Sequence, residues 1–359
     1  MVILGSTGSI GVNTLNICRR FNIEVETLVA GSNIDLLNNQ IEEFKPSIVV
    51  VANSADISRV NHNRVYSGEE GILIAIEESN SLKVVNALVG YLGLMPTIRS
   101  IELGKEVALA NKESLVVAGK FIDISKITPI DSEHFALWYL VDKKPINKLY
   151  ITASGGAFRD WDIDDIKGAN YKDALNHPNW SMGSKITIDS ASMVNKLFEL
   201  LEARWLFNSS NIDAFIERKS LIHALVEFKD GSTTAHLSRA NMQLPIAYAL
   251  NCNITEPILE PLNLLEIGSL SFEKIKQSRY PIWQIKSHLL SNPDMGVVLN
   301  AANEVAIDRF KSGEFGFFGM VDVLLEAYRY FDKTVTNSIE DIVFIDKEVR
   351  EFTQKIKYS

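Results

Sequence analysis

The chain opens with a short apolar segment that is followed at once by glycines and small polar residues. Residues 1–4 (MVIL) predict a buried strand, and residues 5–11 (GSTGSIG) lead into a helical pattern. Glycines suit this place because a pyrophosphate must come closer to the backbone than a Cβ would allow, with the helix amides as donors. A GxxGxxG string alone can also be an ordinary tight turn. Its position after the first strand favours a dinucleotide-binding turn.

Apolar runs that read as strands recur along the first third of the chain. They lie at residues 25–30, 48–52, 84–89 and 107–110, with helical or loop segments between them. This alternation predicts an α/β fold that begins with a Rossmann-like, doubly wound parallel sheet. Where the second strand ends, a NAD-binding fold usually carries an acid for the ribose, but here the chain reads Gly31-Ser32-Asn33. The absence of an acid favours NADP as the cofactor. An ordinary turn with no role in cofactor binding is an equally good interpretation of residues 31–33.

The composition narrows the class of ligand. With 359 residues, 46% hydrophobic content and a formal net charge of −9, we expect a globular chain of two or three domains. A negative charge gives no long-range attraction to nucleic acid or to an anionic membrane, so a bound phosphate needs a local site, which favours a small molecule. Cys18 and Cys252 form no CxxC pattern, which indicates a reducing, cytoplasmic setting. We expect no export signal and no membrane-spanning segment.

The segment from His177 to Glu202 holds more ligand-capable side chains than a buried helix needs. Apolar residues recur at helical spacing from 190 to 207, while Asn195, Glu199 and Glu202 share one polar stripe. We expect this helix to start at residues 189–192, where hydroxyls, backbone amides and the nearby Lys196 suit a phosphate. A phosphate at the tip and a carboxylate one turn further would set an anionic substrate against a metal. Glu202 either supports that site or faces solvent.

Two further acids follow a predicted strand. An apolar run ends in Asp131-Ser132-Glu133, just before another helical pattern, where a helix cap is an equal reading. With Glu199, these acids could supply the all-oxygen site that Mg²⁺ or Mn²⁺ prefers. Lys112 follows the strand at 107–110, at a carboxyl end where open α/β sheets bind ligands. A solvated lysine is the plainer reading of Lys112.

Glycines bracket a segment that could close over the site. Residues 154–184 contain Trp161, His177 and Trp180 between Gly155-Gly156 and Gly183. Such a segment suits a lid that excludes water from a reactive intermediate. The alternative is a surface loop with locally packed tryptophans and a structural His177.

Taken together, these strings resemble one enzyme family. GSTGSIG, AGSN, LANKES, PIDSEH, SGG, HPNWSMG, KITIDSASMVNK, EARWLF and LNAANE are similar to those of the 1-deoxy-D-xylulose-5-phosphate reductoisomerases, and the similarity runs through nearly the whole chain. The resemblance implies a homodimer that rearranges and reduces a sugar phosphate, 1-deoxy-D-xylulose 5-phosphate, to 2-C-methyl-D-erythritol 4-phosphate for isoprenoid synthesis. It implies NADPH and a divalent metal, Mg²⁺, Mn²⁺ or Co²⁺.

The same resemblance, with the residue patterns, predicts the domain plan. We expect an NADPH-binding domain at 1–130 and a central α/β catalytic domain at 131–255 with its lid at 154–184. A connector at 256–282 should lead to a helical domain at 283–359, where the helical pattern dominates.

Site residues follow from the resemblance position by position. It implies dinucleotide contacts at Thr7, Gly8, Ser9, Ile10, Gly31, Ser32, Asn33, Asn111, Glu113 and Gly183. It implies metal ligands at Asp131, Glu133 and Glu199, which with Lys112 form the catalytic set. The implied substrate contacts are Lys112, Ser132, Glu133, Ser154, His177, Trp180, Ser190, Asn195, Lys196 and Glu199. Of these, Ser154, Ser190, Asn195 and Lys196 are aimed at the phosphate, and Trp180 covers the substrate.

Three positions depart from the family pattern. Ser32 stands where a basic residue is common, which weakens the expected preference for NADPH over NADH. Leu197 replaces a commoner glycine and should strengthen its helix. The segment 217–220 (ERKS) stands where the family usually reads HPQS, and the sequence assigns it no role.

Two rival functions make different demands on the chain. A semialdehyde dehydrogenase would need an activated cysteine, which neither Cys18 nor Cys252 offers by its sequence setting. A dinucleotide-sensing regulator would keep the glycine turn but would have no use for three convergent acids.

Overall fold

The computed structural model describes residues 1–141 and 144–358. The chain divides into two compact units. The first contains Met1–Ser114, Ile122–Ser132 and Asn241–Glu260. The second contains Leu115–Phe121, Glu133–Ala240 and the chain from Pro261 onward. Residues 241–260, although late in the sequence, therefore lie with the first unit.

The first unit is built on a seven-stranded parallel sheet with the order β4-β3-β2-β1-β5-β6-β7. Its strands are β1 (Val2–Leu4), β2 (Thr27–Ala30), β3 (Ile48–Val51), β4 (Val65–Ser67), β5 (Lys83–Asn86), β6 (Glu106–Leu109) and β7 (Ile127–Pro129). The chain builds outward from β1 to β4 and then returns to the other side of β1 with β5. The strand order reverses there, which is where doubly wound sheets bind ligands. The predicted Rossmann-like sheet is confirmed.

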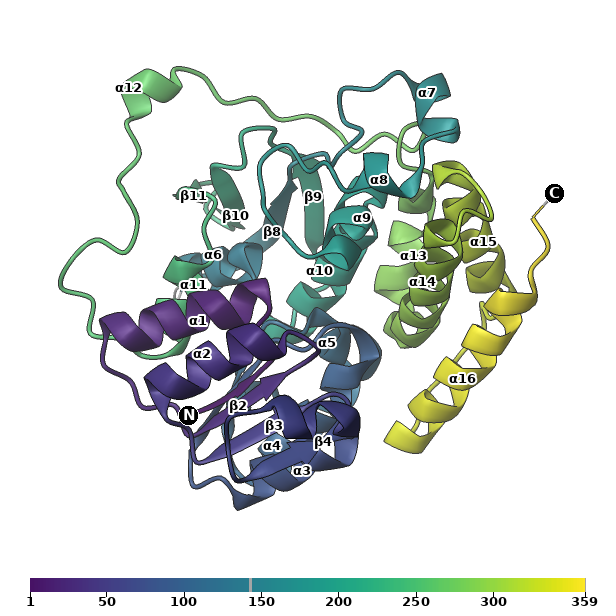
Figure 1. Ribbon diagram of the computed structural model, residues 1–359. Coiled ribbons are helices and arrows are strands. Elements are labelled where there is room, and N and C mark those ends of the chain that lie inside the picture. Colours follow the sequence, from purple (N-terminus) through teal and green to yellow (C-terminus); the bar gives the residue numbers. More distant parts are fainter. Residues whose placement is uncertain (142–143, 359) are drawn as a thin grey trace. The chain divides into compact units, whose positions relative to one another are not determined.

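Successive side chains of each strand enter opposite cores of this unit, as the period of a strand requires. Ile3 packs with residues of α1 and α2, whereas Val2 and Leu4 pack with residues of α3. In Figure 1, α1 and α2 cover one face of the sheet. The helices are α1 (Ser9–Arg20), α2 (Ile34–Phe44), α3 (Gly68–Glu78), α4 (Leu94–Glu102) and α11 (Gln243–Ala249), with 3-10 turns η1 (Ser54–Arg59), η2 (Gly90–Gly93) and η4 (Ile124–Lys126). The returning α11 joins the α1 face. Burial on both faces explains why these strands read as continuous apolar runs.

The second unit contains a four-stranded sheet with the order β11-β10-β8-β9. Its strands are β8 (Ile146–Ala153), β9 (Ile212–Ile216), β10 (Ile222–Phe228) and β11 (Thr233–Leu237). Only β8 and β9 run parallel, and the other two pairs are antiparallel. The helices of this central part are α6 (Ser132–Leu140), α7 (Ile163–Lys167), α8 (Tyr171–Ala174), α9 (Ser184–Ser192) and α10 (Val194–Leu206), preceded by α5 (Lys112–Ala118) and η3 (Gly119–Phe121).

The predicted start of the polar-striped helix is wrong. Residues 189–192 form the last turn of α9, and α10 begins only at Val194. The break is Met193, whose backbone is left-handed at φ 73°. Sequence patterning could not show it, because methionine favours helix and the apolar spacing continues unchanged through the break. Asn195 and Lys196 therefore occupy the first turn of α10, while Ser190 ends α9.

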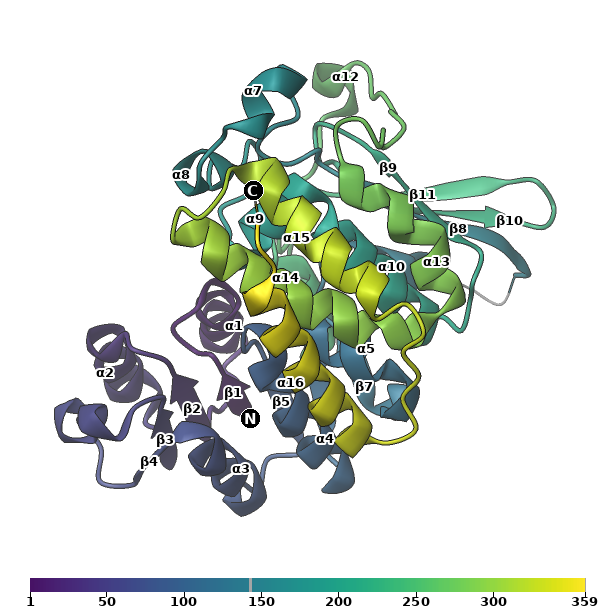
Figure 2. The same ribbon diagram turned by 90° about the vertical axis from the view of Figure 1, so that its right-hand side faces the viewer.

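The chain after the connector is helical, as predicted. It contains α13 (Lys286–Ser291), η6 (Pro293–Met295), α14 (Gly296–Lys311), α15 (Phe317–Tyr330) and α16 (Ile339–Lys355). The connector itself contains α12 (Leu264–Ile267) and the start of η5 (Pro281–Ile285). Figure 2 shows α15 and α16 beside α14, which is the most buried of these helices. Among the described helices, none combines the length and the apolar character that crossing a membrane requires.

Candidate active site

The turn between β1 and α1 is fixed by close backbone packing. Gly5 has φ +87°, and a Cβ there would lie 2.6 Å from the carbonyl oxygen of Ala87. A Cβ on Gly11 would lie 2.2 Å from the carbonyl oxygen of Gly5. Both glycines are therefore required by the fold itself. Between them, Gly8 and Ser9 are exposed at the start of α1, where first-turn amides and the helix dipole favour a phosphate.

The segment after β2 is an exposed turn that starts a helix. Asn33 caps α2, because its side-chain oxygen accepts a hydrogen bond from the amide of Leu36 at 3.2 Å. No atom would touch a Cβ on Gly31, so packing does not demand glycine there. The turn reading of residues 31–33 is thus confirmed in geometry, while contact with a cofactor phosphate stays a prediction.

Asn111 uses its side chain within the protein. Its amide nitrogen donates to the carbonyl oxygens of Leu88 (2.9 Å) and Gly90 (2.8 Å) and to Glu113 Oε2 (3.1 Å). Its oxygen accepts from the amide and the hydroxyl of Ser114. Asn111 therefore fastens the loop after β5 to the loop after β6. A cofactor contact of Asn111 or Glu113 adds to this role and stays a prediction.

Lys112 and Asp131 form an ion pair at the carboxyl ends of two neighbouring strands. Lys112 follows β6 and Asp131 follows β7, and the two strands pair in parallel. Lys112 Nζ donates to Asp131 Oδ2 at 3.1 Å, and the side chains are 8% and 13% exposed. The reading of Lys112 as a solvated lysine is therefore wrong. Ser132 begins α6 and separates Asp131 from Glu133 by one residue along the chain.

In the second unit, Glu133 and Glu199 are joined by a lysine. Lys196 Nζ donates to Glu133 Oε1 at 2.9 Å and pairs with Glu199, which lies three residues along α10. Carboxylate oxygens of the two acids lie within 4.8 Å of one another. Asn195 Nδ2 donates to Glu199 Oε1. Lys196 and Glu199 are 4% and 1% exposed, so the cluster is almost fully removed from water.

The residues behind this cluster are buried as well. His134 Nε2 lies 2.9 Å from the carbonyl oxygen of Glu199, and His134 Nδ1 lies 3.6 Å from Glu202 Oε2. Glu202 is 3% exposed, so the solvent-facing reading of this residue is wrong.

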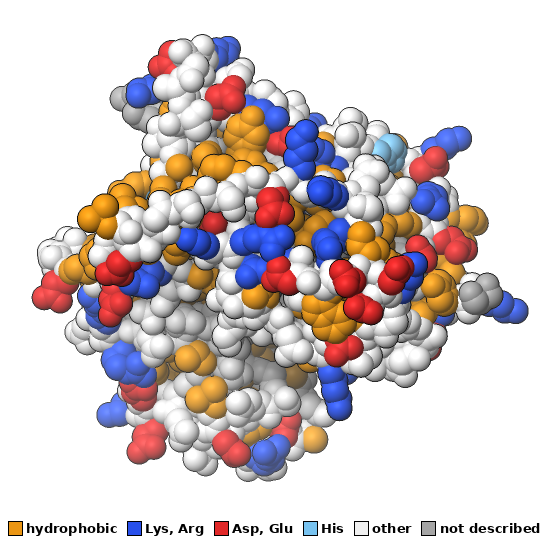
Figure 3. Space-filling model, turned by 90° about the horizontal axis from the view of Figure 1, so that it is seen from above, with side chains coloured by type: hydrophobic (Ala, Val, Ile, Leu, Met, Phe, Trp, Pro, Cys, Tyr) orange, Lys and Arg blue, Asp and Glu red, His pale blue; other side chains and the backbone are white. Residues whose placement is uncertain are grey.

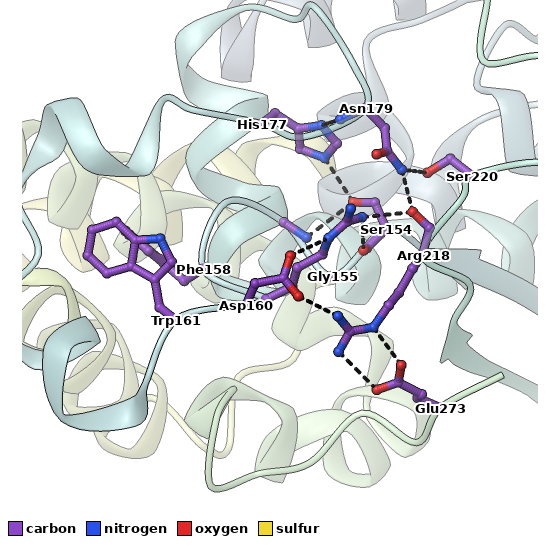
Figure 4. A network of polar contacts seen from close by, with 12 residues as sticks. Ser154, Gly155, Phe158, Asp160, Trp161, His177, Asn179, Arg218, Ser220 and Glu273 are labelled. Carbon is purple, nitrogen blue, oxygen red and sulfur yellow. Dashed lines mark hydrogen bonds and ion pairs between the residues drawn. The ribbon is translucent and has the colours of Figure 1, made fainter. Parts of the chain in front are cut away.

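Ser154 and His177 meet at the base of the predicted lid (Figure 4). His177 Nδ1 accepts hydrogen bonds from the amides of Asn179 (3.1 Å) and Trp180 (2.9 Å). An accepting nitrogen carries no proton, so the neutral ring bears its hydrogen on Nε2, which donates to Ser154 Oγ at 2.8 Å. Burial lowers the pKa of His177 to about 4, with the nearby charge of Arg159 acting in the same direction, so the ring is neutral at pH 7.

Ser154 is thereby left as a hydrogen-bond donor. Its oxygen accepts from His177 Nε2 and from the amide of Gly156 at 3.1 Å, which uses both lone pairs of the hydroxyl. The hydroxyl hydrogen is then available to an acceptor such as a phosphate oxygen. Gly156 has φ +70°, and a Cβ there would lie 2.6 Å from the carbonyl oxygen of Ser190. This glycine therefore lets the loop of Ser154 lie directly against the end of α9.

The remaining predicted residues are spread over the second unit. Trp180 is partly buried, with its ring centroid 6.2 Å from that of His223. Gly183 is the N-cap of α9, and its carbonyl oxygen accepts from Thr187. Gly183 thus belongs to a different unit from the other predicted cofactor contacts. The structure brings together Lys112 with Asp131, Glu133 with Lys196 and Glu199, and Ser154 with His177.

Sequence reasoning missed the residues that hold the lid. Arg159 Nη1 donates to the carbonyl oxygen of Ser154 at 3.0 Å, and Tyr280 OH donates to that of Gly155 at 2.8 Å. Asn179 Nδ2, within the predicted lid, donates to the carbonyl oxygen of Arg218 at 2.7 Å. Tyr280 comes from the predicted connector and is 2% exposed. No local sequence signal marks these residues, because their partners lie far away along the chain.

Comparison with known proteins covers both units. Family profiles described as 1-deoxy-D-xylulose 5-phosphate reductoisomerase, its C-terminal domain and the DXP reductoisomerase C-terminal domain match residues 1–119, 127–207 and 237–352. A 1-deoxy-D-xylulose 5-phosphate reductoisomerase of Nautilia profundicola is 57% identical over 99% of each chain. That of Wolinella succinogenes is 52% identical over 99% of this chain and 100% of its own.

Solved structures agree with the sequence comparison. A DOX-P reductoisomerase in complex with NADPH, fosmidomycin and magnesium aligns with a TM-score of 0.91 at 32% identity, over 98% of this chain and 96% of its own. The 1-deoxy-D-xylulose 5-phosphate reductoisomerase from Zymomonas mobilis in complex with NADPH aligns with a TM-score of 0.87 at 29% identity, over 98% and 97%. The chain belongs to the 1-deoxy-D-xylulose 5-phosphate reductoisomerase family.

Proposed function

We infer that this chain catalyses the NADPH- and divalent-metal-dependent rearrangement and reduction of 1-deoxy-D-xylulose 5-phosphate to 2-C-methyl-D-erythritol 4-phosphate. The observation that carries the inference is identity of 57% and 52% to two reductoisomerases over essentially the full chain. A solved relative that binds NADPH and magnesium gives the cofactors. The reaction supplies a precursor of isoprenoids.

The acids of this chain fit a hard divalent cation. Glu133, which is partly buried, and Glu199, which is buried, present carboxylate oxygens within 4.8 Å of one another, and oxygen donors are what Mg²⁺ and Mn²⁺ prefer. We propose Asp131, Glu133 and Glu199 as the metal ligands. When bound, the cation supplies Lewis acidity for the keto and hydroxyl oxygens of the substrate, and NADPH supplies the hydride.

The protein's own contribution is to position the substrate and balance its charge. Ser154 donates its hydroxyl to the phosphate, while Ser190 and Asn195 line the junction of α9 and α10. Lys196 shares the oxygens of Glu133 and Glu199. With a divalent cation at those oxygens, the ammonium of Lys196 would be able to pair with the substrate phosphate. Lys112 lies beside Asp131, where a cation stabilises negative charge that develops on a substrate oxygen.

For the dinucleotide we propose the residues named from the sequence. Thr7, Gly8, Ser9 and Ile10 offer the start of α1 to the pyrophosphate, and residues 31–33 offer exposed polar groups for the adenosine phosphate. Ser32 brings no positive charge, so the preference for NADPH over NADH rests on hydrogen bonds. The proposed lid residue Trp180 directly follows Asn179, and its backbone amide donates a hydrogen bond to His177 Nδ1 at 2.9 Å.

A homodimer in the cytoplasm is the proposed state of the protein. Among the described residues, β11 is an edge strand of the second sheet. The exposed Tyr139 (55%) lies beside it, with its ring 5.3 Å from that of His236 on β11, and Trp138 on the same helix is 48% exposed. Such an edge with exposed aromatics suits a second copy of the chain. Light scattering should give twice the 40.1 kDa of one chain, and a mass of 40.1 kDa would contradict the proposal.

The activity is tested by following NADPH consumption with 1-deoxy-D-xylulose 5-phosphate, with and without Mg²⁺. We expect turnover only with the metal. In Glu199→Gln one ligand charge is lost, and we expect kcat/KM to fall by at least about 100-fold. Survival of near wild-type, metal-dependent turnover in Glu199→Gln would reject the ligand assignment. Absence of turnover in the wild type would reject the function.

A further inference from the structure

The turn at Glu217–Ser220 connects β9 to β10 and is shaped by a buried carboxylate. Glu217 is 1% exposed, and its oxygens accept from the amides of Lys219 (2.9 Å), Leu221 (2.8 Å) and Ile222 (3.3 Å). A carboxylate has enough lone pairs for these donors, whereas an imidazole offers one acceptor nitrogen at most. Ser220 closes the turn in a left-handed conformation at φ 53°. The shape of this turn therefore depends on the acid at its start.

The backbone of this turn binds both arms of the predicted lid, which we define as residues 154–160 (first arm) and residues 177–180 (second arm). The carbonyl oxygen of Arg218 accepts from Arg159 Nη1 at 2.8 Å and from Asn179 Nδ2 at 2.7 Å. Arg159 belongs to the first arm, where its guanidinium also donates to the carbonyl oxygen of Ser154 at 3.0 Å. Asn179 belongs to the second arm and donates to Ser220 Oγ at 2.7 Å as well. One carbonyl group thus joins segments that are twenty residues apart.

The side chains of the turn extend this contact to the connector (Figure 4). The Arg218 guanidinium binds Asp160 on the first arm and forms a two-pronged ion pair with Glu273. Glu273 is itself paired through its backbone with Ile216, at the end of β9. Lys219 Nζ donates to the carbonyl oxygens of Ile267 (2.8 Å) and Ser269 (2.9 Å) in the connector. The turn is therefore bound on both sides by residues distant in sequence.

This arrangement ends at the ring of His177. The side chain of Asn179 is bound to the turn, and the backbone N–H of Asn179 donates a hydrogen bond to His177 Nδ1. The backbone N–H of Trp180 donates to the same nitrogen. Those two donors set the tautomer in which Nε2 donates to Ser154. We propose that Arg218 is a positioning residue: its guanidinium ties the turn to Asp160 and to Glu273 of the connector, which keeps its carbonyl oxygen in place for Arg159 and Asn179 and so holds His177 and Ser154 ready for the sugar phosphate. The proposal rests on the proposed role of Ser154 and His177 in binding that substrate.

The charged part of this clasp is open to solvent, so its effect should be modest and sensitive to salt. Arg218, Asp160 and Glu273 have side chains that are 39%, 64% and 44% exposed. In the space-filling view from above, basic and acidic side chains lie directly beside one another in the middle of the face (Figure 3). Exposed pairs of this kind contribute little each and are screened by salt.

The test is Arg218→Ala in the full-length enzyme. Without the side chain, a smaller fraction of the protein has its lid arranged for binding. The apparent KM for the sugar phosphate rises in inverse proportion to that fraction. We expect KM for 1-deoxy-D-xylulose 5-phosphate to rise roughly threefold to tenfold, with kcat and the KM for NADPH within about twofold. Arg218→Lys keeps one charge but not the two-pronged contact, so it should restore part of the loss. Raising NaCl screens the anionic substrate in both proteins, so KM should rise in both, but by a larger factor in the wild type than in Arg218→Ala.

Arg19→Ala is the matched control, because Arg19 forms a similarly exposed, two-pronged ion pair with Glu43 in the first unit. It should change neither KM. Equal effects of the two substitutions, or an unchanged sugar-phosphate KM in Arg218→Ala, would overturn the proposal.

Hydrogen exchange gives a readout that needs no substrate. The amides of residues 177–182 should exchange faster in Arg218→Ala than in the wild type and in Arg19→Ala, because the turn whose carbonyl oxygen binds Asn179 has lost its ion pairs to Asp160 and Glu273. Unchanged exchange there would refute the clasp even if the enzyme were inactive on the sugar phosphate. Faster exchange without any wild-type turnover would instead reject the proposed function and keep the clasp.

Discussion

In the first unit, the turn after β1 is held by backbone atoms, whereas in the second unit the site is held by charged side chains. Gly5 and Gly11 lie where a Cβ would overlap carbonyl oxygens, so the shape of the turn depends on the absence of side chains at these two positions. Glu133, Lys196 and Glu199 instead form a buried cluster in which each charge depends on its neighbours. A substitution in the first region should act through sterics, and a substitution in the second should act through uncompensated charge.

A large expected effect tests the steric half of this comparison. In Gly11→Ala the new Cβ would lie 2.2 Å from the Gly5 oxygen and 2.5 Å from Ser6 Cα, and backbone atoms cannot rotate away. Overpacking of this kind costs about 1–3 kcal/mol or more, so we expect a Tm several degrees lower and NADPH affinity at least about tenfold weaker. Gly31→Ala is the control, since it meets no atom within 4 Å, and should keep the wild-type Tm. Equal Tm values for the two variants would show that the turn after β1 can accommodate a Cβ at position 11, which contradicts the steric argument.

Lys196→Met tests the electrostatic half. Removing the ammonium leaves the buried carboxylate of Glu199 close to the partly buried carboxylate of Glu133, which without metal destabilises the protein by about 3 kcal/mol. A divalent cation restores the balance, so Mg²⁺ should raise the Tm of the variant more than that of the wild type. We also expect KM for the sugar phosphate to rise roughly tenfold to 100-fold while the KM for NADPH stays the same.

Calorimetry with and without Mg²⁺, together with steady-state kinetics, checks both expectations for Lys196→Met. Lys185→Met is a useful control, because Lys185 pairs with Asp189 on α9, outside the proposed metal ligands. A Tm of Lys196→Met that does not respond to Mg²⁺ would contradict the proposed competition between ammonium and metal.

The sequence predicts the first unit's turn better than the second unit's charged cluster, because the turn depends on local sterics and the cluster on pairs of residues far apart in the chain. The parallel sheet and the glycine turn could be predicted, because burial of β1 and the steric need for glycine are local properties of a short string. The residues Asp131, Glu133 and Glu199 could be named from a family resemblance, but the pairing of Lys196 with two of them could not. That pairing joins residues 63 positions apart, from Glu133 to Lys196.

Two misreadings have specific physical causes. The break between α9 and α10 falls on Met193, a residue whose left-handed backbone no propensity predicts. The segment 217–220 received no role, because the partners of Arg218 lie 58 and 55 residues away, at Asp160 and Glu273. Long-range ion pairs between exposed residues leave no periodic trace in a sequence.

A smaller effect is expected from acid, through the neutral His177. Its pKa is about 4 in the folded protein and about 6.5 in an unfolded chain. Between these values the unfolded state binds more protons, so the stabilising contribution is full above about pH 6.5 and is lost as the pH falls toward about 4. His236, with a pKa also lowered to about 4 by burial, acts in the same direction.

Urea unfolding between pH 7.5 and 4.5 measures this loss. His177→Gln and His236→Gln should each flatten the pH profile in part, and only the former should also raise the KM for the sugar phosphate. A profile that neither substitution changes would show that other groups cause the acid sensitivity.

The smallest expected effect decides between the two readings of Asn33. Its side chain caps α2, and loss of such a cap costs about 1 kcal/mol, so Asn33→Ala should lower the Tm by a few degrees at most. Asn53→Ala removes a comparable cap from η1 and serves as the control. If Asn33 also binds the adenosine phosphate, its loss should raise the KM for NADPH by a few-fold and leave that for NADH unchanged, because only NADPH carries that group. A variant that behaves like Asn53→Ala with both cofactors would reduce Asn33 to a helix cap and place the choice of NADPH elsewhere in the first unit.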